Sequence, residues 1–220
     1  MFEACNAAER IIPYIECPLF DISILGKMIL SFLRPHLTNE QFHFLELKAE
    51  EAEYLVSLFS KAVEAPDLRA EGNSIAEVLT FLINFSRQCG QDVEDQIDMQ
   101  PSKKEVSSFK ANYDKRKCVL QNNVQIIAVY GILIPLETLL ALPNNDPLVM
   151  AQALQLLWNL LHLDSIVKAF PSSLKEVVQH LQPSPDSGAQ SLVLCVRWLL
   201  SDLDKKGNTY YTLLHDCTNT

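Results

Sequence analysis

The sequence predicts an all-α fold, and three observations lead to this prediction. Hydrophobic residues make up 48% of the 220 residues, which is enough to fill an extended core. Gly and Pro are few, at 6 and 11, which argues against an all-β fold built on tight turns. Leu recurs at spacings of three and four, which places side chains on one face of a helix.

One helical pattern occurs twice in the sequence. The stretch QALQLLWNLLHLD covers 152–164, and SLVLCVRWLLSDLD covers 191–204. Each follows a shorter apolar helix and a break, PNNDP in the first case and QPSPDSG in the second. A shift of 40 residues aligns equivalent positions in the two stretches: Pro143 with Pro183, Asp146 with Asp186, Leu154 with Leu194, Trp158 with Trp198, and Leu160 with Leu200. Both helices are apolar on nearly every side, so we expect them to be buried between neighbouring units, with Trp158 in the core.

Pro147 and Gly131 predict where helices begin and turn. Pro147 is expected in the first turn of a helix, where its missing N–H has no intrahelical partner to lose. Gly131 divides a short helix from a second one within 122–140, at a sharp turn that favours positive φ. The equivalent turn in the following unit has Phe170-Pro171 instead.

The segment 122–140 resembles the armadillo repeat: it has a short helix led by asparagine, then a Gly, and then the pattern IPxLxxLL. Periods near 40 residues are typical of armadillo and HEAT arrays. The resemblance implies one armadillo-like domain over 1–220, a right-handed α-solenoid of about four degenerate repeats. The expected units are 1–38, 39–90, 118–163 and 164–205.

The segment 91–117 does not fit this repeat. It is polar throughout, acidic at its start and basic at Lys115–Lys117, and it lengthens the spacing between the second and third units. We expect a polar insertion loop here, mobile over 91–112, with helix resuming before Cys118. Such a loop is either functional or a tolerated insertion. The tail after Lys205 is expected to form a capping helix or to fray.

Charge and targeting signals limit the classes of partner. The net charge of −9 disfavours nucleic acid and anionic membranes. The start of the sequence lacks the pattern of a secretory signal, and Pro135 and Glu137 interrupt the most apolar stretch, so we expect a cytoplasmic, or nuclear, protein. Six cysteines without a CxxC pair are expected to be reduced thiols in the core.

The sequence offers no catalytic or metal motif. The five histidines are scattered, and no phosphate loop or nucleophile motif is present. The stretch from Asp202 begins like a calcium loop, with Asp204 and Gly207 in place, but Lys206 and Leu213 occupy ligand positions. We therefore expect no enzyme activity, no metal and no cofactor.

The remaining candidate is a surface. The armadillo resemblance implies a concave groove for a protein or extended peptide, in which an asparagine late in the third helix bonds the peptide backbone. Asn84 and Asn159 match that position, and we add Gln155 and Arg197 as groove residues. The predicted function is a non-enzymatic interaction scaffold or adaptor. The alternatives are a regulatory, nucleotide-sensing armadillo domain of an innate-immune or TIR-type signalling protein, and self-assembly through an exposed helical edge.

Overall fold

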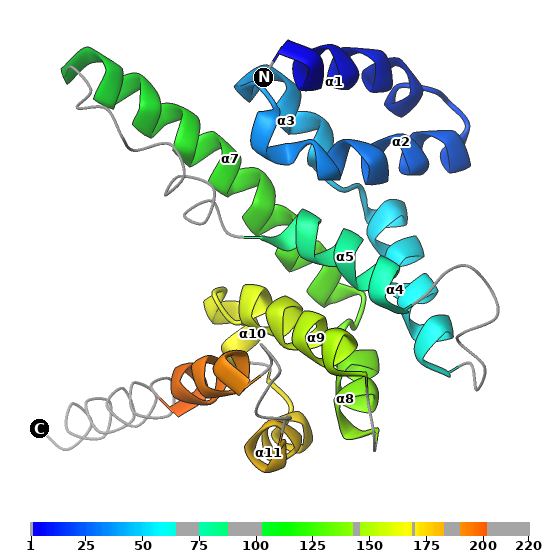
Figure 1. The fold of residues 1–220 in the computed structure, drawn as a ribbon, viewed down its shortest axis with the longest axis vertical. Helices are drawn as coiled ribbons and strands as arrows, with labels where there is room; N and C mark the ends of the chain where they lie inside the picture. Colours follow the sequence, from blue (N-terminus) through cyan, green and yellow to red (C-terminus); the bar gives the residue numbers. More distant parts are fainter. Residues whose placement is uncertain are drawn as a thin grey trace, which may run out of the picture. The chain divides into compact units, whose positions relative to one another are not determined.

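The computed structural model describes residues 2–64, 75–87, 103–142, 146–168, 170–182 and 190–201. Within these ranges every regular element is helical, which confirms the all-α class (Figure 1). The chain divides into two compact units, 1–132 and 133–220. The continuous armadillo-like solenoid stays a prediction.

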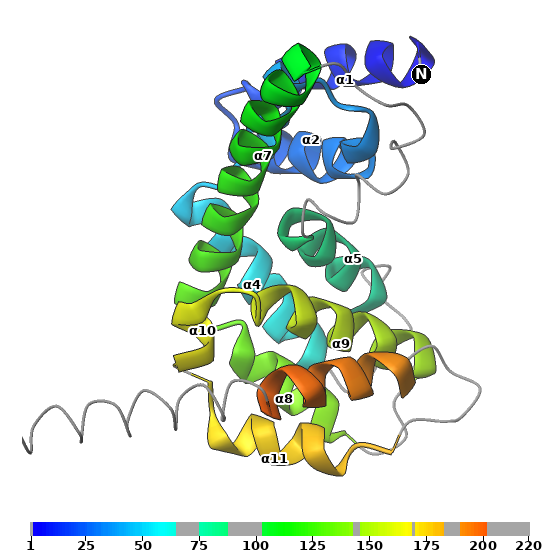
Figure 2. The same ribbon diagram turned by 90° about the vertical axis from the view of Figure 1, so that its left-hand side faces the viewer.

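The first unit is built on a helical hairpin and one long helix. Helices α1 and α2 pack against each other, and α7 runs along α3, α4 and α5 (Figures 1 and 2). Its elements are α1 (Phe2–Ile15), α2 (Phe20–Phe32), η1 (Arg34–His36), α3 (Asn39–Phe42), η2 (His43–Leu45), α4 (Ala49–Glu64), α5 (Ile75–Ser86) and α7 (Lys103–Val129). Its core is aromatic and aliphatic, with Phe42, Phe59, Phe85 and Ile127 fully buried.

The prediction of an insertion loop over 91–117 is wrong from Lys103 onward, because Lys103–Val129 form helix α7. Many residues from Lys103 to Lys117 are good helix formers, and the polar side chains of Asp114, Lys115 and Lys117 are exposed on the helix. Arg116 fastens this part of α7: its Nε donates to Asn39 Oδ1 at 2.8 Å, an Nη donates to the Leu37 carbonyl at 2.7 Å, and the guanidinium lies over the Phe42 ring. Residues 91–102 lie outside the described part.

The second unit contains α8 (Leu133–Ala141), α9 (Pro147–Leu160), α10 (Asp164–Lys168), α11 (Ser172–His180) and a helix over Gln190–Ser201. Pro147 is the first residue of α9, and Asp146 caps it by accepting from the N–H groups of Leu148 and Val149. Gly131, at the end of the first unit, has φ of 83°. Both turn predictions are therefore confirmed.

The two repeated helices differ in burial. In α9 the residues Ala153, Leu154, Leu156, Leu157 and Leu160 are fully buried, as predicted, and Trp158 is half-buried. The helix Gln190–Ser201 buries one stripe only, and Leu194 and Trp198 are exposed by 59% and 65%. The expectation that both helices are buried all round is wrong for the second one.

The structure also bears on the expected burial of the cysteines and on membrane-spanning helices. Cys118 and Cys195 are free and exposed, so the prediction of core thiols is wrong for both of them, while Cys17 is half-buried. Within the described ranges no single helix is long and apolar enough to cross a membrane; Tyr113–Val129 and Leu133–Ala141 reach that length only when they are counted together.

Candidate functional site

The residues predicted to line a groove all have partners inside the fold. Asn159 is fully buried and accepts from the Gln155 amide at 3.0 Å, so it presents no surface to a peptide. Arg197 donates to the carbonyls at the end of α11, those of Val178, Gln179 and Leu181, at 3.0, 2.8 and 2.6 Å. It therefore satisfies carbonyls that lack intrahelical donors.

Asn84 belongs to the first unit, and the other three predicted residues belong to the second. Its amide lies 3.4 Å from Ser31 Oγ, and its backbone carbonyl accepts from Arg34 at 3.1 Å. These contacts join α5 to α2 and to the turn that follows α2. Asn84 thus helps to hold α5 against α2, which the sequence did not indicate.

Helix α2 turns an unusual side to the protein interior. Its buried face carries Ser23, Lys27 and Ser31 together with Gly26, Ile24 and Leu30. Its opposite face carries four apolar residues that are exposed by 37%, 55%, 46% and 54%: Ile22, Leu25, Ile29 and Phe32. We call these four residues the α2 apolar stripe. In an ordinary surface helix the polar residues would be outside and the apolar ones inside.

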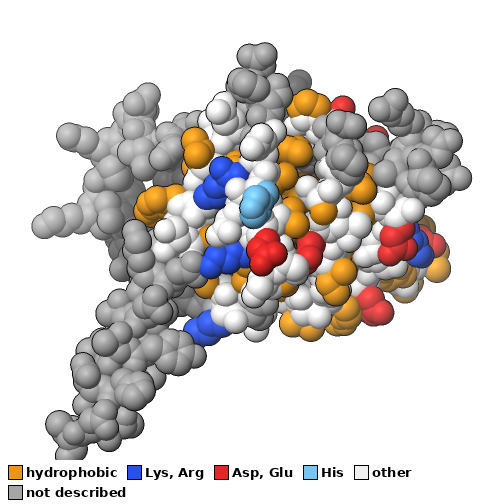
Figure 3. All heavy atoms as spheres, turned by 90° about the horizontal axis from the view of Figure 1, so that it is seen from below, with side chains coloured by type: hydrophobic (Ala, Val, Ile, Leu, Met, Phe, Trp, Pro, Cys, Tyr) orange, Lys and Arg blue, Asp and Glu red, His pale blue; other side chains and the backbone are white. Residues whose placement is uncertain are grey.

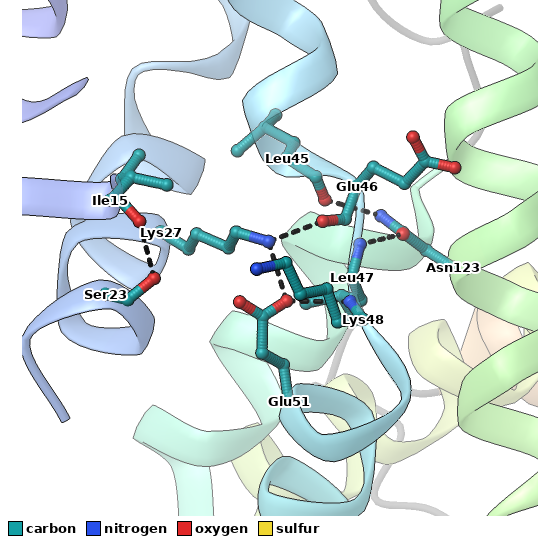
Figure 4. A network of polar contacts seen from close by, with 9 residues as sticks. All are labelled: Ile15, Ser23, Lys27, Leu45, Glu46, Leu47, Lys48, Glu51 and Asn123. Atoms are coloured by element: carbon teal, nitrogen blue, oxygen red, sulfur yellow. Dashed lines mark hydrogen bonds and ion pairs between the residues drawn. The ribbon is translucent and has the colours of Figure 1, made fainter. Parts of the chain in front are cut away.

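A buried polar network holds α2 in this orientation (Figure 4). Lys27 Nζ donates to Glu51 Oε2 at 2.6 Å and to the Glu46 carbonyl at 2.6 Å. The same Glu51 oxygen accepts from the Lys48 N–H at 2.7 Å, which ties the start of α4 to the lysine of α2. The side chains of Lys27 and Glu51 are only 6% and 3% exposed.

The charge state of Lys27 reflects two opposing effects. Burial lowers the pKa of Lys27 from its ordinary value of 10.5, while the hydrogen bond and the charge of Glu51 act in the opposite direction. Removing a lysine from water without a partner is costly, and Glu51 supplies that partner. A rotation of α2 that buried its apolar stripe would break this pair and leave the Glu51 carboxylate alone inside the protein.

Two contacts with α1 fix the hairpin beside this network. Ser23 Oγ donates to the Ile15 carbonyl at 2.6 Å. At Gly26 an added Cβ would lie 3.0 Å from Ile15 Cγ1 and 3.3 Å from the Ile15 backbone nitrogen. The close approach of the two helices therefore requires a small residue at position 26.

Asn123 of α7 holds the other side of the same loop. Its Oδ1 accepts from the Leu47 N–H at 2.8 Å, and its Nδ2 donates to the carbonyls of Leu45 and Phe85 at 2.9 and 3.1 Å. The side chain is fully buried, so these bonds satisfy an amide that has no access to water. The segment 45–48 is thereby held between Lys27 and Asn123 (Figure 4).

A depression of about 470 Å³ opens beside the network. Its lining mixes both signs of charge with an aromatic wall and is formed by Ile15, Glu16, Lys27, His43, Phe44, Glu46, Leu47 and Lys48. The His43 and Phe44 rings lie with their centroids 4.0 Å apart. The size is that of a small-ligand site. The second unit has a smaller depression of about 230 Å³ beside Arg197.

The described residues also bear on two other kinds of site, a metal site and a nucleic-acid surface. In the part of the chain that can be described, no cluster of three His, Cys, Asp or Glu residues could hold a metal ion. One face of the molecule, seen in Figure 3, carries hydrophobic side chains between charges of both signs, without a continuous basic field. A basic field is what an ordinary nucleic-acid surface requires.

Sequence reasoning missed Lys27, Glu51 and Asn123. A signal exists for two of them, because Lys27 interrupts the apolar run ISILGKMIL and Asn123 lies within an apolar helical pattern. A polar residue on the apolar side of a helix needs a partner, but neither run indicates which residue that is. No protein-family model matches the chain, and no curated protein or solved structure matches it.

Proposed function

We propose that the chain is a protein–protein interaction module without catalytic activity of its own, and that it docks a partner helix on the α2 apolar stripe. The observation that supports this is the pairing of an exposed apolar face with a buried polar face on one helix. The proposal keeps the interaction function expected from the sequence and moves the surface from the asparagine groove to α2.

The spacing of the stripe suits a helical partner. Ile22, Leu25, Ile29 and Phe32 follow each other at intervals of three, four and three residues, which places them in one row along α2. An amphipathic helix recognises such a row with its own apolar positions. The Phe32 ring also contacts Phe81 of α5 edge to face, with centroids 5.4 Å apart, so the row ends at an ordered aromatic pair.

A display library of helical peptides, with apolar residues at three-four-three spacing and variable flanks, tests this function. Binders should lose affinity for Leu25→Glu by roughly thirtyfold or more, because a central interface residue carries about 2 kcal/mol or more. The matched control is Leu194→Glu, since Leu194 is exposed to a similar extent on a helix of the second unit. A selection that yields only peptides indifferent to Leu25→Glu would refute the proposal.

A second candidate is regulation by a small ligand in the depression beside Lys27. Its volume and its His43–Phe44 wall favour this function. Because Glu16 and Glu46 share the lining with Lys27 and Lys48, a zwitterionic or neutral ligand fits better than a polyphosphate. A thermal-shift titration with small zwitterionic and neutral compounds tests this function, because a ligand that binds must raise the melting temperature. NAD carries a pyrophosphate, so its titration tests the nucleotide-sensing alternative separately. No shift at millimolar nucleotide would remove the nucleotide-sensing alternative.

A further inference from the structure

We propose that two copies of this chain associate through the α2 apolar stripe in an antiparallel, two-fold arrangement. This rests on the proposed function, because it takes the stripe to be a docking surface, and it adds the identity of the partner. The stripe is symmetric about position 27: Ile22 and Phe32 lie five residues from that position, and Leu25 and Ile29 lie two residues from it. A two-fold interface uses the same patch on both copies, so the patch must complement itself.

The two-fold arrangement pairs unlike apolar residues. With the axis crossing the interface at the level of position 27 along the helix, Ile22 of one copy lies opposite Phe32 of the other, and Leu25 lies opposite Ile29. A large aromatic ring therefore meets a smaller branched side chain at each end, and two medium-sized aliphatic side chains meet near the centre. Alternation of this kind allows side chains from two helices to interdigitate.

Charge selects the antiparallel direction. Between Phe20 and Phe32 the only exposed charged side chain is Asp21, because Lys27 is buried against Glu51. A parallel pair would bring the two Asp21 carboxylates to the same end of the interface. In the antiparallel pair they lie twelve helical positions apart, about 18 Å along the axis and beyond the screening length of about 10 Å at moderate salt.

The area available is sufficient for a weak dimer. The stripe and the neighbouring Leu19, which is 61% exposed, offer roughly 500 Å² on each copy, so a symmetric pair buries about 1,000 Å². This lies at the lower limit for a specific interface, and area alone does not set affinity. We therefore expect monomer and dimer to exchange with concentration.

Sedimentation velocity of the full chain over a wide concentration series tests the proposal. The wild type should shift from monomer to dimer as its concentration rises. Leu25→Glu/Ile29→Glu should weaken dimerisation by roughly tenfold or more, because like charges then face each other across the axis. The control Leu194→Glu should dimerise as the wild type does. All of these positions are exposed, so the variants are expected to fold, and circular dichroism checks this.

A mixed variant tests the direction of packing. In Leu25→Lys/Ile29→Glu the introduced lysine of one copy faces the introduced glutamate of the other only when the helices are antiparallel. This variant should dimerise more strongly than Leu25→Glu/Ile29→Glu. In a parallel pair like charges would meet at both positions, and the two variants would be equally weak, which would overturn the arrangement.

Other outcomes separate this inference from the proposed function. A wild type that stays monomeric at every concentration, or a dimer that survives Leu25→Glu/Ile29→Glu, overturns the inference. If such a protein still binds library peptides in a manner that depends on Leu25, the proposed function stands and only the identity of the partner fails. If peptide binding and dimerisation are both independent of Leu25, both proposals fail.

Discussion

Helices α2 and α9 are of nearly equal length, 13 and 14 residues, and both are rich in apolar residues, yet they turn opposite sides to the interior. Helix α9 buries a row of leucines. Helix α2 buries serine, lysine and glycine beside Ile24 and Leu30, and it leaves half of its eight large apolar side chains exposed. The difference shows that an apolar pattern predicts a helix but does not decide which face is covered.

The buried polar side chains of the two helices differ in where their partners lie. In α9 the buried amide of Asn159 accepts a bond from Gln155 of the same helix. In α2 the buried ammonium of Lys27 is bound by Glu51, which lies 24 residues further along the chain. This ion pair and the contacts of Ser23 and Gly26 with Ile15 accompany the orientation that leaves the α2 apolar stripe exposed.

The largest effect is expected when that carboxylate is removed. Glu51→Ala leaves the Lys27 ammonium buried without its partner, and the free energy of unfolding should fall by about 3–5 kcal/mol. Urea denaturation followed by circular dichroism measures this. The double variant Lys27→Met/Glu51→Ala should recover most of the loss, because no uncompensated charge then remains. Equal losses in the single and double variants would mean that the pair does not hold α2.

The next effect contrasts leucines of the two helices. Leu157 of α9 is fully buried, and Leu157→Ala should cost about 2–5 kcal/mol through lost burial and the cavity left behind. Leu25 of α2 is 55% exposed, and Leu25→Ala should change stability by no more than about 0.5 kcal/mol. The same denaturation experiment at low protein concentration compares them. A large cost at Leu25 would show that the stripe is covered within one copy.

The pH dependence of stability reports on the buried lysine. Its pKa is lower in the folded chain than the ordinary value of 10.5, so between these two values the unfolded chain binds more protons at this site. The contribution of Lys27 to the free energy of unfolding must therefore rise with pH through this window and level off above 10.5.

The measurement is the difference in unfolding free energy between wild type and Lys27→Met as a function of pH. Other alkaline titrations are common to both proteins and cancel in the difference. The charged groups near Lys27 are Glu51, Lys48 and Glu46, and all three remain in the variant. A difference that is flat with pH, or that falls as pH rises, would contradict the lowered pKa of Lys27.

Much of the local structure could be predicted from the sequence, because it depends on nearby residues. The start of α9 follows from Pro147, and the turn at Gly131 follows from the cost of positive φ for other residues. The candidate site could not be predicted. The contacts of Lys27 with Glu51, and of Asn123 with Leu45 and Phe85, join segments that are 24 to 78 residues apart, and no periodicity encodes them.

Polarity also misled the sequence reasoning in two places. Residues 103–112 were expected to belong to a mobile loop because they are polar, although they are part of α7, which Arg116 joins to Asn39. Asn159 was assigned to a groove because of its place in a motif, whereas its side chain is fully buried and bonded to Gln155. In both places the motif specifies a residue type, and packing decides whether the side chain faces water.

The last expected effect concerns the first turns of the same two helices. In α9 the Asp146 carboxylate accepts from two backbone N–H groups, whereas in α2 the equivalent residue, Leu19, provides no side-chain bond. Asp146→Ala should therefore lose about 1 kcal/mol of unfolding free energy, and Leu19→Asp should gain a similar amount. The gain is possible because Leu19 is exposed and already has the extended backbone, φ −80° and ψ 116°, of a capping residue.

Leu19→Ala removes the leucine without adding a cap, so only the difference between the Asp and Ala variants measures capping. If Leu19→Asp is no more stable than Leu19→Ala, a capping side chain does not stabilise the first turn of α2. The packing of α2 against α1 then determines both the start and the orientation of α2.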